Sequence, residues 1–416
     1  MDLHGRPLVI AHVQTRMTKG GGAEENVWAS CVHQANSGHT VHLFAGSESD
    51  IAFYKGLSGN IQVHLVPSMI RALSPKADYA AYREMAQMFE TVRPDIVHTH
   101  TSKAGIVGRL AAKKAGVPAI IHGVHILPFS NTGLLQKLIY LSAEHAVAPI
   151  TDHFIHVSRG TREAYRRAMV GRRATHSVVR SGMMIEKFRG AAWPDDWQAI
   201  LGVSDRDQKP PTILMMAALE ARKRHTQFIT AFANATVKGE NIRLLLGGEG
   251  PMHATLARLI EELEVGDRVK LLGYRKDPEC LVAMADVGVL ASLREGLPRV
   301  VVQYLAGGIP AVVSPLEGIA EIVDPDFNGI IAATDDAGLV AEEAVRLVRD
   351  PVLLERLTGG VKAAAVDEWT FESMYRQIDD SYSVALERPA VKRRLSRVER
   401  REGVAATDPS IDALQG

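Results

Sequence analysis

The sequence predicts an α/β protein with two domains, each built on a parallel sheet. Two observations support this prediction. Short apolar runs rich in β-branched residues alternate with helical stretches of about 10–15 residues, and the same pattern restarts in the second half of the chain. A chain of 416 residues is long enough for two cores, since domains have roughly 100–200 residues.

In the first half, the alternation begins with an apolar run at 8–13 (LVIAHV), followed by glycines and a helical stretch that ends before Gly38. Each later run is bounded by turn residues or by a helical pattern. The predicted strands are 8–13, 40–45, 61–66, 95–99, 119–122, 154–157 and 177–180, and the clearest helices are 23–36, 78–91 and 104–115.

The second half repeats this organisation after a polar stretch that ends in two prolines, at 205–211. The predicted strands there are 212–216, 242–246, 269–272, 287–290 and 311–314, with helices at 225–237, 252–263 and 298–307. We therefore expect a first domain at 1–190, a linker at 191–211 and a second domain at 212–370. Each domain should have a crevice at the carboxyl ends of its strands.

The C-terminal part has a different pattern. Apolar residues recur at helical spacing in 371–387, which predicts one amphipathic helix. The segment 388–401 then has seven basic residues and one acidic residue, and little apolar content follows it. We therefore expect 388–416 to be a disordered basic tail.

Composition narrows the function classes. Because 48 Lys and Arg balance 48 Asp and Glu, no overall field favours nucleic acid as a partner. Two cysteines are too few for a disulfide scaffold or a four-thiolate zinc site, which fits a reducing compartment. No apolar run approaches the ~20 residues of a membrane span, and residues 1–7 lack the apolar core of a signal peptide. We expect a cytoplasmic protein.

The most informative motif is Arg-Glu-Gly-Leu-Pro-Arg at 294–299, with Gln303 four residues further on. Glu295 follows a buried strand, and Pro298 suits the first turn of the next helix. A helix N-terminus at this edge can hold phosphate through its free N–H groups and its dipole. The alternative is an ordinary loop with a helix-capping Glu.

In this strand–loop–helix context, the motif resembles the retaining GT-B glycosyltransferases of family four, which carry a Glu, seven residues and a second Glu. Glu295 matches the first Glu, and Gln303 replaces the second. The resemblance implies that Glu295 contacts the donor sugar and that position 303 binds the ribose hydroxyls, here without charge assistance. Gly296, Leu297 and Pro298 would then belong to the donor site.

The resemblance extends through the second half. Gly248 and Gly250 match a Gly-x-Gly-Pro turn, and Glu321 matches a Gly-x-x-Glu segment near the nucleotide. Residues 216–223 match a phosphate loop, where Lys223 falls on a lysine that contacts the diphosphate as a point charge.

One expected cation of that loop is missing, because Ala218 stands where the family has an arginine. Arg222 and Arg224 are candidates to replace it, and Arg222 is taken as a donor-binding residue. The alternative is that both arginines belong to a solvated basic turn.

The first half also matches. Gly21 and Gly22 follow the first strand, at the position of the family's glycine loop. In the family, the glycines of this loop let the backbone approach the diphosphate closely. Residues 95–105 (DIVHTHTSKAG) resemble those of bacterial transferases of surface-polysaccharide and glycan assembly. In addition, the counterpart of His125 lies near the donor sugar and the reacting bond, which makes His125 a catalytic candidate with Glu295 and Lys223.

From the segment 95–105 we take His100, Ser102 and Lys103 as candidate acceptor contacts. The whole resemblance covers about residues 8–386. It implies two Rossmann-like domains that face each other across a cleft.

Two short motifs in the sequence contain residue types that bind metal ions. His98 and His100 point to the same side of one strand, but no third ligand follows at a fixed spacing. We therefore expect hydrogen bonds or substrate contacts from them. Asp324-Pro325-Asp326 precedes Phe-Asn-Gly and is interpreted as a turn. We expect no metal and no cofactor beyond a nucleotide-sugar co-substrate.

The resemblance implies a metal-independent, retaining hexosyl transfer from a nucleotide diphosphate sugar, with UDP-sugar favoured, to an acceptor hydroxyl. The favoured acceptor is a lipid-linked or surface-glycan intermediate in a bacterium. The basic tail could then hold the enzyme at anionic lipid on the inner face of the cell membrane, unless it is simply solvated. The alternatives are transfer to a small soluble metabolite, and a catalytically silent protein that binds nucleotide or glycan, which Gln303 and Ala218 keep open.

Overall fold

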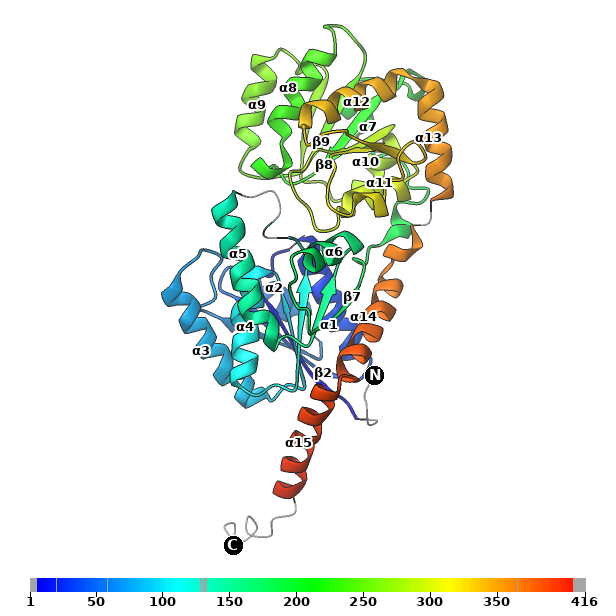
Figure 1. The fold of residues 1–416 in the computed structure, drawn as a ribbon. Helices are drawn as coiled ribbons and strands as arrows, with labels where there is room; N and C mark the ends of the chain where they lie inside the picture. The colour runs from blue at the N-terminus through cyan, green and yellow to red at the C-terminus, as the bar shows by residue number, and fades with distance from the viewer. Residues whose placement is uncertain are drawn as a thin grey trace. The chain divides into compact units, whose positions relative to one another are not determined.

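The computed structural model describes residues 6–406 except 20, 58, 128, 130–132 and 365. The chain forms two compact units (Figure 1). Unit 1 comprises Met1–Val157, Thr161–Arg180 and Met374–Gly416, and unit 2 comprises Ser158–Gly160 and Ser181–Ser373. The expected fold class, two α/β domains on parallel sheets, is confirmed.

Unit 1 is built on a seven-stranded parallel sheet in the order β3-β2-β1-β4-β5-β6-β7. The strands are β1 (Val9–Gln14), β2 (Thr40–Gly46), β3 (Ile61–Val66), β4 (Ile96–His100), β5 (Ala119–Val124), β6 (His153–His156) and β7 (Thr175–Val178). Neighbouring residues of a strand face opposite sides of the sheet, so both sides carry a core. Leu43 packs with Val27 and Cys31 on one side, and Phe44 packs with Met85 and Phe89 on the other.

The helices of unit 1 cover both faces of this sheet. They are α1 (Gly22–Asn36), α2 (Ile51–Leu57), α3 (Pro75–Val92), α4 (Ser102–Lys114), α5 (Leu134–Val147), α6 (Arg159–Arg167), α14 (Phe371–Leu386) and α15 (Pro389–Ala406). The chain thus enters unit 1 a second time at its C-terminal end. No helix among the described residues is long and apolar enough to cross a membrane.

Unit 2 has a six-stranded parallel sheet in the order β10-β9-β8-β11-β12-β13. The strands are β8 (Thr212–Met216), β9 (Arg243–Gly247), β10 (Val269–Gly273), β11 (Val287–Leu290), β12 (Ala311–Val313) and β13 (Gly329–Ile331). The helices are α7 (Trp197–Leu201), α8 (His225–Ala235), α9 (His253–Glu262), α10 (Pro278–Met284), α11 (Arg299–Ala306), α12 (Ala337–Arg349) and α13 (Pro351–Ala363). Phe228, Phe232 and Leu244 lie in its main core.

The C-terminal segment corrects one expectation. The prediction of disorder from residue 388 is wrong over α15, because Val391 and Leu395 are buried there. Two arginines also tie the segment to unit 1: Arg388 donates to the carbonyl oxygen of Asp152, and Arg394 lies 2.5 Å from its carboxylate. Residues 407–416 of the expected tail lie outside the described residues.

The expected linker at 191–211 also contains structure. These residues belong to unit 2, where α7 buries Ile200 and Leu201. The chain leaves unit 1 at Arg180, earlier than the predicted boundary at 190. The apolar residues of α7 explain the difference, since their burial stabilises folded structure in a stretch whose ends are polar.

The interior of unit 1 contains many histidines that are neutral. His153 shows the cause: its imidazole is buried between Thr175 Oγ1 at 2.7 Å and Ser177 Oγ at 2.8 Å. Burial lowers its pKa to about 3, with contributions from His176 and Arg388. Since the unfolded chain binds this proton below pH 6.5, stability should fall as pH decreases from 6.5 toward 3, and should be insensitive to His153 above 6.5.

We predict that wild type loses more stability than His153→Gln when the pH is lowered from 7 to 5. The difference in the change of unfolding free energy should be about 2 kcal/mol. Urea unfolding at the two pH values measures this difference. His253→Gln is the control, because His253 is exposed at the start of α9. An equal pH dependence in wild type and His153→Gln would contradict the assignment.

Candidate functional site

A basic turn connects β8 to α8 at the carboxyl edge of the unit 2 sheet. It contains the short helix η4 (Ala221–Lys223) and then Arg224, whose backbone is left-handed at φ 58°. The Arg224 guanidinium donates to the carbonyl oxygen of Ala291 at 2.6 Å and to Ser314 Oγ at 2.9 Å. Arg224 therefore ties the turn to the segments that follow β11 and β12.

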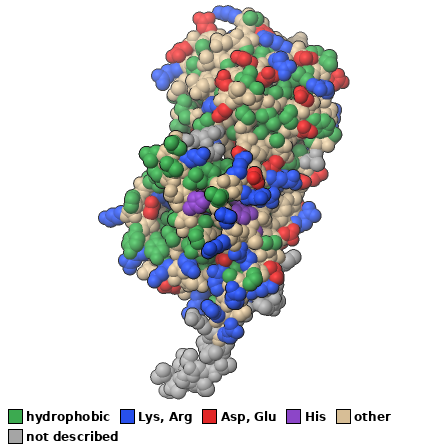
Figure 2. Space-filling view, viewed as in Figure 1, with side chains coloured by type: hydrophobic (Ala, Val, Ile, Leu, Met, Phe, Trp, Pro, Cys, Tyr) green, Lys and Arg blue, Asp and Glu red, His purple; other side chains and the backbone are tan. Residues whose placement is uncertain are grey.

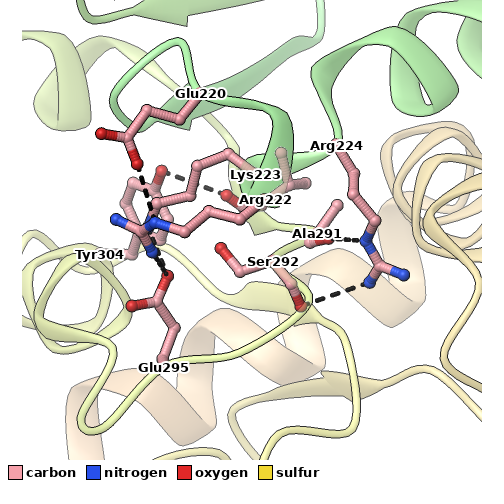
Figure 3. A network of polar contacts seen from close by, with 9 residues as sticks. Glu220, Arg222, Lys223, Arg224, Ala291, Ser292, Glu295 and Tyr304 are labelled. Atoms are coloured by element: carbon pink, nitrogen blue, oxygen red, sulfur yellow. Dashed lines mark hydrogen bonds and ion pairs between the residues drawn. The ribbon is translucent and has the colours of Figure 1, made fainter. Parts of the chain in front are cut away.

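Two cations of this turn meet one carboxylate (Figure 3). Lys223 Nζ donates to Glu295 Oε1, and Arg222 Nη1 lies 3.3 Å from the same oxygen. Arg222 also donates through Nε to Glu220 Oε2 at 2.8 Å. The side chains of Lys223 and Glu295 are only 11% and 13% exposed. The structure thus brings together Arg222, Lys223 and Glu295, three residues singled out from the sequence.

The Gly248–Gly250 turn packs directly against the loop before this basic turn. A Cβ on Gly248 would lie 2.0 Å from the carbonyl oxygen of Ala217, and one on Gly250 would lie 2.5 Å from that of Leu219. The amide of Leu219 donates to the carbonyl oxygen of Glu249 at 2.8 Å. Both glycines therefore allow two backbones to approach at the carboxyl ends of β8 and β9.

The other predicted donor residues follow the next two strands. Gly296, Leu297 and Pro298 lie in the loop after β11, and Pro298 caps α11 instead of entering its first turn. Gln303 lies on α11 and is half-buried, and Glu321 ends η5 (Ile319–Glu321), which follows β12. All these positions come after carboxyl ends of parallel strands, which meet at one edge of a sheet.

Sequence reasoning missed two residues around this site. Tyr304 on α11 accepts a hydrogen bond from the amide of Met216 at 2.8 Å and donates to the carbonyl oxygen of Val289 at 3.3 Å, so it joins β8 to β11. His225 is buried beside Lys223, and burial together with the Lys223 charge lowers its pKa to about 4. Neither residue stands out in the sequence, because both roles depend on tertiary contacts.

In unit 1, Gly21 precedes α1 and Gly22 begins it. A Cβ on Gly21 would lie 2.2 Å from Glu24 Oε2, so this carboxylate covers the expected glycine loop. Glu24 Oε1 also accepts from Thr18 Oγ1 at 3.4 Å. An anion could approach Gly21 here only after the Glu24 side chain moves.

The predicted acceptor residues separate into two groups. Ser102 and Lys103 begin α4 and line a pocket of about 950 Å³, where Lys103 Nζ lies 2.6 Å from Asp78 Oδ1. His100 is instead 3% exposed and lies in the sheet, 2.9 Å from His125 Nε2 through its Nδ1. His125 follows β5, and burial lowers its pKa to about 4.

The pocket combines apolar walls with positive charge. Its apolar or aromatic lining residues are Leu73, Tyr79, Tyr82, Ile106, Val107, Leu110, Ile126 and Tyr140. Its cations are Arg16, Arg71, Lys103, Lys113 and Lys114, which outnumber the two lining carboxylates, Glu24 and Asp78. Beside it, α5 exposes Leu134, Leu135, Leu138 and Ile139, and hydrophobic side chains gather over this helix (Figure 2). The arrangement suits a ligand with both an anionic and a hydrocarbon part.

Two family models match the chain. The "Glycosyl transferase 4-like domain" matches residues 21–182, and "Glycosyl transferases group 1" matches residues 198–362. The match of the second model contains Arg222, Lys223 and Glu295.

Curated relatives share long stretches with the chain. The Escherichia coli UDP-Gal:alpha-D-GlcNAc-diphosphoundecaprenol alpha-1,3-galactosyltransferase is 28% identical over 349 residues, which cover 83% of this chain and 89% of that protein. The Campylobacter jejuni N,N'-diacetylbacillosaminyl-diphospho-undecaprenol alpha-1,3-N-acetylgalactosaminyltransferase is 25% identical over 307 residues. The match covers 72% of this chain and 79% of that protein.

Solved structures show the same fold. Anabaena HepE in complex with UDP and glucose has a TM-score of 0.72 at 20% identity, and the match covers 91% of this chain and all of that one. Sucrose-phosphate synthase from Thermosynechococcus elongatus has a TM-score of 0.73 at 20% identity, with 90% and 98% covered. This likeness identifies the fold as GT-B.

We predict that Gly250→Ala is more destabilising than Gly239→Ala. Both glycines have positive φ, which costs a side chain about 1–2 kcal/mol, but nothing lies within 4 Å of a Cβ at Gly239. The overlap with Leu219 should add about 1–3 kcal/mol. Urea unfolding measures both variants, and equal destabilisation would show that the close approach is unimportant.

Proposed function

This chain is a GT-B glycosyltransferase of family four, and we propose that it transfers a sugar from a UDP-sugar to a hydroxyl of a lipid-linked glycan with retention of configuration. The observation that carries the proposal is the convergence of Lys223 and Arg222 on Glu295 at the carboxyl edge of the unit 2 sheet. The UDP donor is supported by the names of relatives and neighbours, which include UDP-Gal and UDP.

The cations would stabilise the leaving group. When the sugar–phosphate bond breaks, negative charge develops on the departing diphosphate, and pre-placed donors in a shielded site lower the energy of that state. Without donor, Glu295 holds Lys223 and Arg222 in place. A diphosphate offers more charge and more acceptor oxygens than one carboxylate, so it would draw the cations and leave Glu295 to the sugar hydroxyls.

This mechanism uses the chain's own cations and is proposed to need no divalent ion. The acceptor hydroxyl would attack the anomeric carbon on the face that the diphosphate leaves, and a diphosphate oxygen would take the hydroxyl proton. A glycosyl adduct trapped on Glu295 would contradict this same-face mechanism.

The proposed acceptor is a glycan that is joined to a polyprenol through a diphosphate. The unit 1 pocket supports it, because its cations suit the diphosphate and its apolar walls suit the hydrocarbon. The names of the Escherichia coli and Campylobacter jejuni relatives contain the same diphosphoundecaprenol group. We further propose that exposed Arg393, Arg397 and Arg400 on α15 favour anionic lipid at the inner face of the membrane.

Turnover tests the proposed reaction. The purified full chain is incubated with a panel of nucleotide sugars and a polyprenyl-diphosphate-linked acceptor, with and without EDTA, and both UDP and product are measured. We expect acceptor-dependent UDP release that EDTA does not abolish. Transfer that requires a divalent ion would contradict metal independence, and an active donor that is not a UDP-sugar would contradict the donor assignment.

We predict that Lys223→Met lowers kcat/KM by on the order of 10²–10³, because it removes a cation from the leaving group. Lys209→Met is the matched control. Lys209 also forms a shielded ion pair, with Asp286, but this pair lies at the amino end of β8. Similar activity loss in both variants would contradict a catalytic role for Lys223.

We predict that Lys103→Met raises the acceptor KM roughly tenfold, as expected for about 1.4 kcal/mol of lost binding, without changing the donor KM. Lys76→Met serves as the control, because Lys76 lies on α3 outside the pocket lining. Initial rates at varied acceptor and at varied donor separate the two constants. An unchanged acceptor KM would contradict the assignment of this pocket to acceptor binding.

A further inference from the structure

Three histidines that the proposed reaction does not use lie together inside unit 1. His12 on β1 is paired in register with His98 on β4, and His100 lies two residues further along β4 on the same face. One ring nitrogen of each lies within 4.8 Å of the other two, and none of the three residues is more than 3% exposed. The fold supplies in His12 the third ligand that sequence spacing alone does not reveal.

The neighbours of these rings determine which nitrogens have free lone pairs. His12 Nε2 lies 2.7 Å from Gln34 Oε1, and because a carbonyl oxygen only accepts, this nitrogen carries the proton. His12 Nδ1 therefore has a lone pair, which points at His100 Nε2 at 3.0 Å. His98 Nδ1 bonds to Tyr382 Oη at 2.9 Å, and the buried His98 Nε2 has no partner. When Nδ1 donates this bond, Nε2 has a free lone pair.

His100 can be protonated in two ways. A proton on Nε2 would be donated to His12 Nδ1 at 3.0 Å. His98 Nε2 has no hydrogen-bond partner in either case. A proton on Nδ1 would instead be donated to His125 Nε2 at 2.9 Å. The lone pairs of His12 Nδ1 and His100 Nε2 would then lie 3.0 Å apart with no proton between them. A cation bound by both nitrogens, to one side of the line that joins them, would stabilise this arrangement.

A glycine packs directly against two of these rings. A Cβ on Gly123 of β5 would lie 3.1 Å from His98 Nε2 and 2.9 Å from His100 Nδ1. Any other residue would crowd both rings, so Gly123 lets the two imidazoles lie against the backbone of β5.

We propose that His12, His98 and His100 bind a divalent transition metal ion of the zinc type through His12 Nδ1, His98 Nε2 and His100 Nε2. Neutral imidazoles are preferred ligands of such ions, and the burial of all three rings favours their neutral forms. Gln34 and Tyr382 hold the outer nitrogens, as the second layer of metal sites commonly does.

The ion would join β1 to β4 and fix the proton of His100 on Nδ1. That proton is then donated to His125 Nε2, so His125 carries its own proton on Nδ1. The site is separate from the leaving-group chemistry of unit 2. It therefore agrees with sugar transfer that requires no divalent ion at the diphosphate.

Metal retention by the full chain tests the proposal independently of activity. Protein loaded with Zn²⁺ is desalted and its zinc content measured, and loading with Co²⁺ gives the absorption spectrum of the bound ion. We expect one ion per chain in wild type, and loss of retention in His98→Ala. His64→Ala should retain the ion, because His64 and His42 form a partly buried pair at 2.9 Å that no third histidine joins among the described residues.

Gly123→Ala is the second variant, since it keeps all three ligands but its Cβ would displace the rings of His98 and His100. It should weaken retention while circular dichroism shows a folded chain. Folded wild-type protein that retains no zinc after loading would overturn the proposal. Equal zinc retention by folded His98→Ala and His64→Ala would overturn the ligand assignment.

Discussion

The ion pair between Lys223 and Glu295 is the interaction on which the proposed chemistry depends. Its two side chains come from segments that follow different strands, so the pair exists only because parallel strands end at a common edge. Arg224 fastens the basic turn to the ends of β11 and β12, and Gly250 lets a second loop pack against it. The backbone of unit 2 thus positions the cations before any donor binds, which is the condition for electrostatic catalysis.

Unit 1 uses a different physical solution in its interior. Where unit 2 packs Phe228, Phe232 and apolar strands, unit 1 places neutral histidines against one another and against hydroxyl groups. Burial keeps their pKa values low, so these rings serve as hydrogen-bond partners without charge. Such an interior is stable near neutral pH and is sensitive to acid, and it also provides nitrogen ligands in a fixed geometry.

Much of the fold could be predicted because central parallel strands are buried on both faces and therefore leave clear apolar runs. The short β13 left no such signal. The family resemblance implied that Lys223 and Glu295 belong to one donor site. Their direct contact, the clamp made by Arg224 and the bonds of Tyr304 depend on tertiary contacts that the sequence does not show. In α15, a high density of positive charge concealed the burial of two apolar side chains.

The most direct test of the account is a crystal structure of the full chain with a UDP-sugar bound. The account predicts that the β-phosphate lies within hydrogen-bonding distance of Lys223 Nζ or the Arg222 guanidinium. Glu295 should then face the sugar instead of these cations. A donor bound elsewhere, with the ion pair of Lys223 and Glu295 unchanged, would contradict the assignment of the diphosphate site.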